Sequence, residues 1–408
     1  MACDASNDRR IVSRASGGSV QTNAARVSCS MPRDYSDRAS LLRLLAALVK
    51  GDDTSPPAFD QRQLFLELAR DHRVEHLAAW RITERKGDVE AWFGAPASGF
   101  REEARTLAVV DAVRTEEIAS VLAHLAGIDG AQPLLFKGAA LAHSHYPHSW
   151  LRPRLDTDML VSPSSAASVF EALRTLGYER TTSTSGALIV AQASFTRTDA
   201  FGVTHALDVH WKIANRQVIA RVTSHGDLAS RSVAVPALGE AAREVSRADA
   251  LLLACLHRAA HHRDSEELLW LYDIHLIAER LTSRDWACVV AAARRGAVQT
   301  ICHRGLALAV DYFDSPVPRQ VMELLARARD EPSSIYVSKK LRLVDGLVSD
   351  LRALSVRDGV RLVAEHVCPP AEYIRKKYGL TSRRSLLVFY ARRIAAGVPR
   401  WFTLGGWS

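Results

Sequence analysis

Apolar residues recur every three or four positions near both ends of the chain, and this period changes in the middle. The spacing in 38–50, 60–85 and about 99–127 is that of amphipathic helices. Between 133 and 213 the apolar positions form short runs of strand length. From about 246 to 365 the helical spacing returns. The pattern predicts an α+β fold, in which a small mixed β-sheet core is flanked by N-terminal and C-terminal helical regions.

Four of the central runs are predicted to be strands. They span 133–137, 155–162, 188–198 and 204–213. The last two are separated by the turn-forming residues 199–202, which predicts that they pair as a hairpin. A helix is predicted between the second and third strands, and it is followed by Gly177, placed where a helix commonly ends in the left-handed conformation.

Changes of composition divide the chain further. Residues 1–35 contain almost no large apolar side chains, so they cannot bury enough surface to offset the entropy lost on ordering. We therefore predict that 1–35 is disordered. The other units are predicted to be an N-terminal helical region at 36–130, a central core at 131–215, a C-terminal helical domain at 216–370 and a basic tail at 371–408.

The basic tail holds nearly all of the excess positive charge. The chain has a formal net charge of +8, and residues 371–408 contain eight Lys or Arg against one Glu, a net +7. Such a segment suits contact with nucleic acid or an anionic surface, and it is equally the composition of a solvated basic helix. Both interpretations stay open.

The overall composition is that of a globular protein. The 408 residues are 48% hydrophobic and 24% charged, and no run reaches the ~18 apolar residues that a membrane span needs. The N-terminus has no apolar stretch of the signal-peptide kind. The six cysteines are irregularly spaced and form no CxxC pair, which favours free thiols over a zinc site. We therefore expect a cytoplasmic location.

Three acidic residues are candidates for a metal site. Asp156 and Asp158 are two apart on a predicted strand, so their side chains point to the same face. Two carboxylates this close stay ionised together when a cation compensates them, and a hard ion such as Mg²⁺ suits them. If the strand with Asp208 is adjacent, the three acids converge and can hold two ions. The alternative is that Asp156 and Asp158 only cap a strand end at the surface.

A second feature is the Lys137-Gly138 turn, which falls where a strand is predicted to lead into a helix. Glycine allows a phosphate to approach the backbone, the first N–H groups of a helix bind anions, and Lys137 adds a point charge. The GxxxxGK[ST] spacing of a P-loop is absent. The alternative is a surface lysine before an ordinary glycine turn.

Taken together, these features resemble a known family. The stretch FKGAALAHSHYPHSWLRPRLDTDMLV (136–161) is similar to the KGxAL…Y…RPxxDxDLLV pattern of the uncharacterised nucleotidyltransferase family. LDVHW (207–211) is similar to the strand that carries the third acid of that family, and 251–274 and 369–378 resemble its later segments. The chain departs from better-known relatives in having Lys-Gly in place of a Gly-Ser turn, 18 residues before the first acid.

The resemblance implies the DNA-polymerase-β-like nucleotidyltransferase fold, with the catalytic core at 131–215. It implies that Asp156, Asp158 and Asp208 bind Mg²⁺, as a two-metal site. The implied reaction transfers NMP from an NTP, with ATP favoured, to an acceptor whose class stays open between peptide, protein, sugar and tRNA. Family members often lie beside genes for peptide modification or polysaccharide synthesis, which implies a biosynthetic role.

The resemblance also implies roles for three further residues. Lys137 and Gly138 take the place of the phosphate-binding turn. Arg152 reaches the triphosphate or fixes the loop before the strand. His210 is two residues after Asp208 on the same face of the predicted strand, so it can orient Asp208, contact a phosphate or act as a base.

Two other functions stay open beside this one. A similar arrangement of Lys-Gly, Arg and paired acids occurs in nucleotidyltransferase-like toxins of toxin–antitoxin pairs, which act on tRNA or protein. An inactive nucleotide-binding scaffold is the other alternative, and the presence of every expected acid and of the lysine argues against it.

Clustered histidines are a further set of candidates. One group combines imidazoles and acids: His257, His261, His262, Asp264 and Asp273. Imidazoles one helical turn apart can share a metal ion, border an acceptor pocket, or pack at a seam between helices and core. A second group follows the Lys-Gly turn and belongs either to a site or to a solvated loop: His143, His145 and His148.

Overall fold

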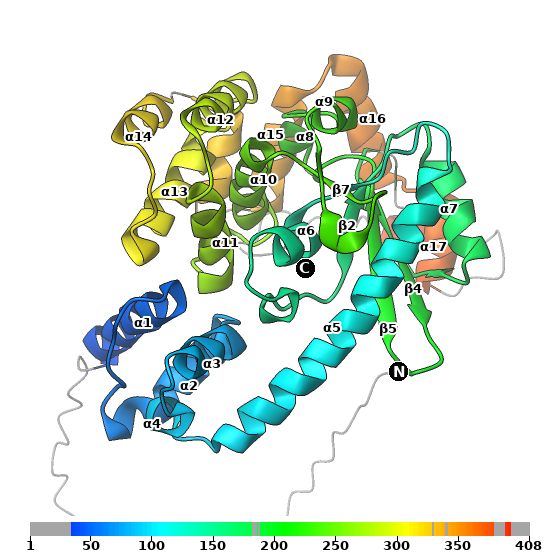
Figure 1. Ribbon diagram of the computed structural model, residues 1–408. Coiled ribbons are helices and arrows are strands. Elements are labelled where there is room, and N and C mark those ends of the chain that lie inside the picture. The colour runs from blue at the N-terminus through cyan, green and yellow to red at the C-terminus, as the bar shows by residue number, and fades with distance from the viewer. Residues whose placement is uncertain are drawn as a thin grey trace, which may run out of the picture.

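The computed structural model describes residues 34–181, 186, 188–328, 330–338, 342–378 and 388–392. The segment predicted to be disordered, 1–35, lies almost entirely outside these residues. Of the predicted basic tail, 371–408, only 371–378 and 388–392 are described. Helices precede, surround and follow one β-sheet, which confirms the predicted α+β class (Figure 1).

A mixed sheet forms the centre of the molecule. Its strands are β1 (Leu134–Leu135), β2 (Thr157–Leu160), β3 (Glu179–Arg180), β4 (Gln192–Thr198), β5 (Thr204–His210), β6 (Val233–Ala234) and β7 (Arg243–Glu244). The seven strands lie in the order β3-β4-β5-β2-β1-β7-β6. The pairs β2–β5 and β1–β7 are parallel, and the others are antiparallel. All four predicted strands are present, and β3, β6 and β7 extend the sheet at its edges.

The predicted hairpin joins β4 to β5. Thr198 pairs with Thr204, and Gly202 in the turn has a φ of 78°, which glycine adopts without a steric penalty. On its other side β5 pairs in parallel with β2, and this register sets Asp158 opposite Asp208. Two strands that are far apart in the sequence therefore bring candidate acids together.

The helices are numbered along the chain. Up to the end of the sheet they are α1 (Asp34–Lys50), α2 (Arg62–Asp71), α3 (Glu75–Glu84), α4 (Val89–Phe93), α5 (Ala97–Ala126), α6 (Lys137–Ser144), α7 (Ala166–Thr175), α8 (Gln217–Ala220) and α9 (His225–Ser230). After the sheet they are α10 (Arg247–Ala260), α11 (Leu268–Ala278), α12 (Ser283–Arg295), α13 (Gln299–Phe313), α14 (Arg319–Leu325), α15 (Leu343–Ala353), α16 (Val356–Val367) and α17 (Ala371–Tyr378). Short 3₁₀ helices are Phe59–Gln61, Ser149–Leu151, Pro236–Leu238 and Pro332–Val337.

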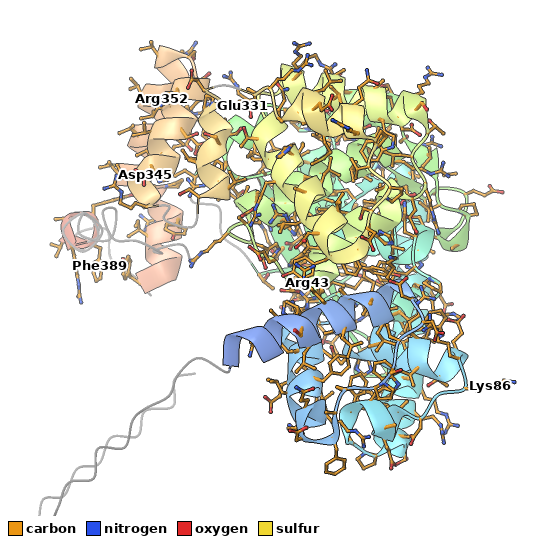
Figure 2. All side chains as sticks on the ribbon, turned by 90° about the vertical axis from the view of Figure 1, so that its left-hand side faces the viewer. Arg43, Lys86, Glu331, Asp345, Arg352 and Phe389 are labelled. Atoms are coloured by element: carbon orange, nitrogen blue, oxygen red, sulfur yellow. The ribbon has the colours of Figure 1, made fainter. Side chains whose placement is uncertain are left out.

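Helices α1 to α4 form a lobe that packs against the C-terminal helices. Leu45 of this lobe belongs to the same hydrophobic cluster as Leu268 and Tyr272 of α11. Figure 2 shows Arg43 at the boundary, where it donates hydrogen bonds to Asp311 of α13. The lobe is therefore anchored by buried apolar contacts as well as by surface charges.

Helix α5 joins this lobe to the sheet, and helices α6 and α7 follow strands of the sheet. The 30-residue helix α5 runs from the lobe to the sheet, as Figure 1 shows in cyan. Its second half buries Ile118, Leu122 and Leu125 in the cluster that covers the sheet. Helix α6 begins just after β1, at the predicted junction, and Lys137 is its first residue. Helix α7 is followed by Gly177 at a φ of 84°, as predicted.

The C-terminal helices bury a large core of their own. Leu252 on α10, Ile274 on α11 and Leu306 on α13 belong to one cluster, which also contains Leu160 of β2. The cysteines in the described part of the chain are free thiols. Among the described helices, none has the length and apolar character needed to cross a membrane.

Candidate functional site

Two neighbouring strands carry the candidate acids. Asp158 on β2 and Asp208 on β5 are register partners, so their side chains leave the same face of the sheet side by side. Asp156 is exposed and lies in the bend before β2, whose first residue is Thr157. The strand predicted at 155–162 is therefore shorter than expected, and only one acid of the Asp156–Asp158 pair is held by the sheet.

Asp158 is buried and is neutralised by two side chains. Its Oδ1 accepts hydrogen bonds from Lys137 Nζ at 2.7 Å and from His210 Nε2 at 2.8 Å. Because an ionised carboxylate only accepts hydrogen bonds, His210 carries its proton on Nε2. Burial would raise the pKa of Asp158, but the Lys137 charge and the His210 hydrogen bond outweigh it and hold this pKa well below its usual value. The Asp158 carboxylate is therefore ionised.

Lys137 reaches Asp158 from an unusual backbone conformation. Its φ is 56°, a left-handed value that costs a residue with a side chain roughly 1–2 kcal/mol. From this position Nζ contacts Asp158 and lies 4.7 Å from the centre of the Phe136 ring. Strained backbone of this kind concentrates at functional sites.

Asp158, Asp208 and His210 together have the geometry of a cation site. Each offers one ligand atom, and these atoms all lie within 4.8 Å of one another. Gln192 Nε2 donates a hydrogen bond to Asp208 Oδ2 at 2.6 Å and so orients that carboxylate. The two carboxylates suit a divalent ion such as Mg²⁺ or Mn²⁺, and His210 would join them as a ligand only if its hydrogen bond to Asp158 were broken.

Asp156 lies outside that group of ligand atoms but is affected by its charges. Partial desolvation, together with the negative charges of Asp158 and Asp208, raises the pKa of Asp156 to about 6. A cation bound nearby would favour the ionised form. The predicted set of three acids therefore occurs as a close pair, with Asp156 beside it.

Arg152 is buried and holds the loop that leads to Asp156. Its Nε and Nη2 donate to the two carboxylate oxygens of Asp273 on α11, at 3.0 and 2.6 Å. The Tyr146 hydroxyl donates to the same carboxylate at 2.8 Å. The guanidinium also lies against Gly138, where a Cβ would be only 2.4 Å from Arg152 Nη1. Of the two roles predicted for Arg152, this geometry matches fixing the loop.

A comparison with protein families decides the class of the chain. A model described as an uncharacterised nucleotidyltransferase matches residues 59–314, more than half of the 408 residues. The chain belongs to this nucleotidyltransferase family. No curated protein matches it. The matched region begins before α2 and ends after α13, so the nucleotidyltransferase domain includes most of the N-terminal lobe, the whole sheet and α10 to α13.

The clustered histidines of the nucleotidyltransferase lie beside the acids. His257 Nε2 and His262 Nε2 are hydrogen-bonded at 2.9 Å, and His262 stacks on Trp270 with ring centres 4.4 Å apart. Burial and the nearby Lys137 charge lower the pKa values of His257 and His261, so both rings are neutral. Among the described residues, the histidines of this cluster belong to no group with metal-ligand spacing. The arrangement matches packing at a seam between helices.

Two residues of the candidate site are absent from the sequence-based predictions. Gln192, which holds Asp208, is the register partner of His210, so counting back from the hairpin turn would locate it. Tyr146, which holds Asp273, corresponds to the tyrosine in the family pattern. The signal for each was therefore available, but only in combination with a correct hairpin register or with the family pattern.

Proposed function

We propose that the protein is a Mg²⁺-dependent nucleotidyltransferase that transfers NMP from an NTP, with ATP as the first candidate, to an acceptor hydroxyl or similar group. One observation carries this proposal. Asp158 and Asp208 lie side by side on parallel strands, and Lys137 contacts the Asp158 carboxylate. Membership of the family supports the same reaction class. We propose a DNA-polymerase-β-like architecture for the sheet.

Asp156, Asp158 and Asp208 are the proposed metal ligands, and His210, which donates its Nε2 proton to Asp158, holds that carboxylate in place. The close spacing of the Asp158 and Asp208 ligand atoms supports a divalent ion, and Asp156 lies in the bend just before β2. When bound, such an ion neutralises triphosphate charge and lowers the pKa of an attacking hydroxyl. By holding this ion, the acids would supply most of the electrostatic stabilisation of the transition state.

Lys137 and the first turn of α6 are the proposed triphosphate-binding elements. The ammonium of Lys137 is a point charge held beside Asp158, and the N–H groups at the start of a helix favour an anion. Gly138 leaves room for the Arg152 guanidinium against this turn, and Arg152 fixes the loop before Asp156. Arg152 thus positions the site without contacting the nucleotide.

His210 is proposed to orient Asp158. It is fully buried, its Nε2 proton is donated to Asp158, and burial followed by the Lys137 charge lowers its pKa. A buried, neutral imidazole that already donates to a carboxylate is poorly placed to accept a proton from an acceptor.

The reaction itself is an in-line attack of the acceptor oxygen on the α-phosphorus. The bond to the bridging oxygen breaks and pyrophosphate leaves.

The test combines nucleotide binding with transfer. Binding of each NTP is measured by equilibrium dialysis with Mg²⁺ or Mn²⁺, and transfer is followed as label from [α-³²P]NTP appearing in an extract of the source cells. We expect both for the wild type and neither for Asp208→Asn. Asp129→Asn, which removes an exposed acid from a distant turn, is the matched control and should behave as wild type. Failure of every NTP to bind with either ion would overturn the proposal.

A further inference from the structure

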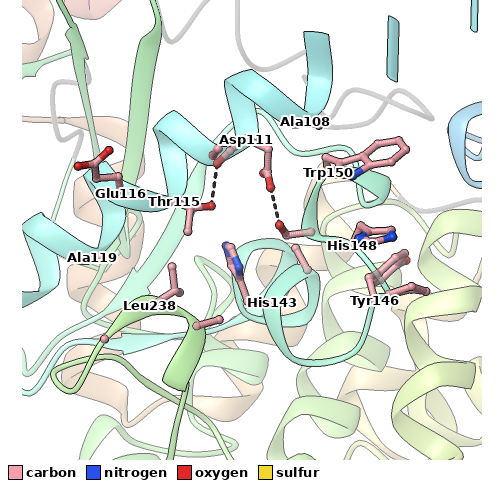
Figure 3. A pocket seen from close by; sticks show the side chains of 16 residues that line it. Ala108, Asp111, Thr115, Glu116, Ala119, His143, Tyr146, His148, Trp150 and Leu238 are labelled. Atoms are coloured by element: carbon pink, nitrogen blue, oxygen red, sulfur yellow. Dashed lines mark hydrogen bonds between the residues drawn. The ribbon is translucent and has the colours of Figure 1, made fainter. Parts of the chain in front are cut away.

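A pocket of about 580 Å³ lies between α5 and α6, apart from the acids (Figure 3). Small residues create the space, since larger side chains at the same positions would fill it: Ala108, Ala112, Ala119, Ala142, Ala237 and Gly239. The volume is that of a typical small-molecule site. The proposed function assigns no role to this pocket.

The two ends of the pocket differ in chemistry. Figure 3 shows Tyr146, His148 and Trp150 gathered at one end, where the His148 and Trp150 rings lie nearly parallel with their centres 6.0 Å apart. Glu116 is exposed at the other end, on α5. His143 points from α6 into the space between them. A ligand that fills the pocket therefore meets aromatic faces at one end and a carboxylate at the other.

His143 contributes a neutral imidazole. Its Nε2 is buried and has no hydrogen-bond partner. Burial, followed by the charge of Arg154, lowers the pKa of His143 to about 4, so the ring offers one donor and one acceptor at neutral pH. Because Nε2 is covered, a ligand hydroxyl would gain a hydrogen bond to it only after the ring turns toward the pocket.

The lining disfavours phosphates. Among the described side chains that line the pocket, none is a lysine or an arginine, whereas Glu116 is a carboxylate. The Asp111 carboxylate also lines the pocket, but it already accepts hydrogen bonds from Arg154 and Ser149. The adjacent Arg154 donates to both Asp111 and the Ser149 backbone oxygen, so its charge is already engaged. Hydroxyl and ammonium groups, which donate to carboxylates and imidazole nitrogens, fit this lining better than anions do.

Helix α6 contributes residues both to the pocket and to the acid cluster. Lys137, its first residue, contacts Asp158, and His143 faces the pocket six residues later, about 9 Å further along the axis. Arg154, which holds Asp111 at the pocket, lies two residues before Asp156. A molecule of two linked rings is about as long as the ~9 Å that separates Lys137 from His143 along the axis of α6.

We propose that this pocket binds a sugar, with amino sugars favoured. We further propose that this sugar is the distal part of the acceptor, a role that rests on the proposed function. Trp150 and His148 offer faces on which the C–H side of a sugar ring stacks. Asp111, Glu116 and His143 offer acceptors for its hydroxyl groups. Glu116 at the open end adds an attraction for an amino group.

The test measures binding without nucleotide or metal, so its result is independent of nucleotidyl transfer. Saturation-transfer NMR is recorded with cellobiose and with its 2,2′-diamino analogue, on the full chain. We expect signals from both sugars with the wild type and with Asp158→Asn, and a several-fold tighter binding of the diamino sugar at low salt. Ala112→Phe, which fills the pocket from the exposed face of α5, should abolish both signals.

A matched pair of charge variants tests the preference for the amino group. Glu116→Gln should remove the advantage of the diamino sugar, whereas Glu102→Gln, which removes an exposed charge further back on α5, should leave it unchanged. The proposal is overturned by an absence of saturation transfer from both sugars, or by transfer that survives Ala112→Phe. Either result leaves the proposed nucleotidyl transfer standing, because that reaction is judged by NTP binding and by Asp208→Asn.

Discussion

Two buried clusters of charge meet at the first turn of α6, and they are built differently. Lys137 contacts the carboxylate cluster on β2 and β5, while its neighbour Gly138 contacts the guanidinium of Arg152 in the second cluster. In the second cluster one arginine and one aspartate, Asp273, form two parallel hydrogen bonds. In the first, a single lysine faces several acids.

The difference separates a binding site from a structural contact. The Arg152–Asp273 pair is balanced in charge and its hydrogen bonds are satisfied internally, with Tyr146 as an additional donor. The carboxylate cluster has more acids than cations, and burial followed by the charges of Asp158 and Asp208 raises the pKa of Asp156. Acids whose negative charges are not matched by neighbouring cations favour the binding of a cation from solution.

Breaking the balanced pair should have the largest effect on stability. Arg152→Met leaves the buried Asp273 carboxylate without its cation, so we expect the free energy of unfolding to fall by about 3–5 kcal/mol. Urea unfolding measures this. The control is Arg43→Met, which breaks an exposed pair with Asp311 and should cost less than ~1 kcal/mol. Equal costs for the two variants would show that the Arg152 pair contributes nothing specific.

Breaking the unbalanced cluster should affect turnover more than folding. Asp158→Asn removes the carboxylate that Lys137 and His210 hold ionised, so we expect the rate of pyrophosphate release to fall about 100-fold or more. The free energy of unfolding should also fall, because the buried Lys137 ammonium loses its carboxylate, so turnover is compared at equal concentrations of folded protein. Asp129→Asn serves as the control here too, and an Asp158→Asn protein with normal turnover would contradict the assignment.

Glu244 is a third case beside the balanced Arg152–Asp273 pair and the unbalanced carboxylate cluster. This acid is buried and forms no ion pair among the described residues. Burial raises its pKa from 4.5 to about 7, against the lowering effects of Ser144, Arg247 and Arg280. A raised pKa in the folded state means that stability is full at low pH and is lost as the pH rises from about 4.5 to about 7.

The variant Glu244→Gln should lack this pH dependence. At pH 8 we expect it to be more stable than the wild type by on the order of 2 kcal/mol, and at pH 4 we expect the two proteins to be alike. Urea unfolding at the two pH values measures the difference. A free energy of unfolding that changes by the same amount between the two pH values in both proteins would contradict the assignment to Glu244.

The smallest expected effect concerns the lysine that partly balances the acids. In Lys137→Met the Asp158 carboxylate is free of its ammonium, so we expect Mn²⁺ to bind the protein about tenfold more tightly while NTP binding weakens. Electron paramagnetic resonance of free Mn²⁺ measures the first change and equilibrium dialysis the second. Lys86→Met, at an exposed lysine of the N-terminal lobe, should leave both unchanged (Figure 2).

Local signals in the sequence were sufficient for much of the fold. The turn residues at 199–202 predict the β4–β5 hairpin, Gly177 marks the end of α7, and the Lys-Gly turn marks the start of α6. These elements depend on residues close together in the chain. The two-residue strands β3, β6 and β7 carry no periodic pattern, so sequence reasoning could not find them.

The site required contacts between distant segments. That Asp158 lies opposite Asp208 depends on the parallel register of β2 and β5, which no local pattern encodes. The partner of Arg152 lies 121 residues away, on α11, so the sequence left its role open between the triphosphate and the loop. The family pattern supplied candidate residues, but the distances among them come from tertiary packing alone.

The contact between Gly138 and Arg152 also limits how this protein can change during evolution. A side chain at 138 would collide with the guanidinium, so it becomes tolerable only after Arg152 has been replaced by a shorter residue. That replacement in turn strands the Asp273 carboxylate unless Asp273 changes first. Substitutions at positions 138, 152 and 273 are therefore expected to occur together among related sequences.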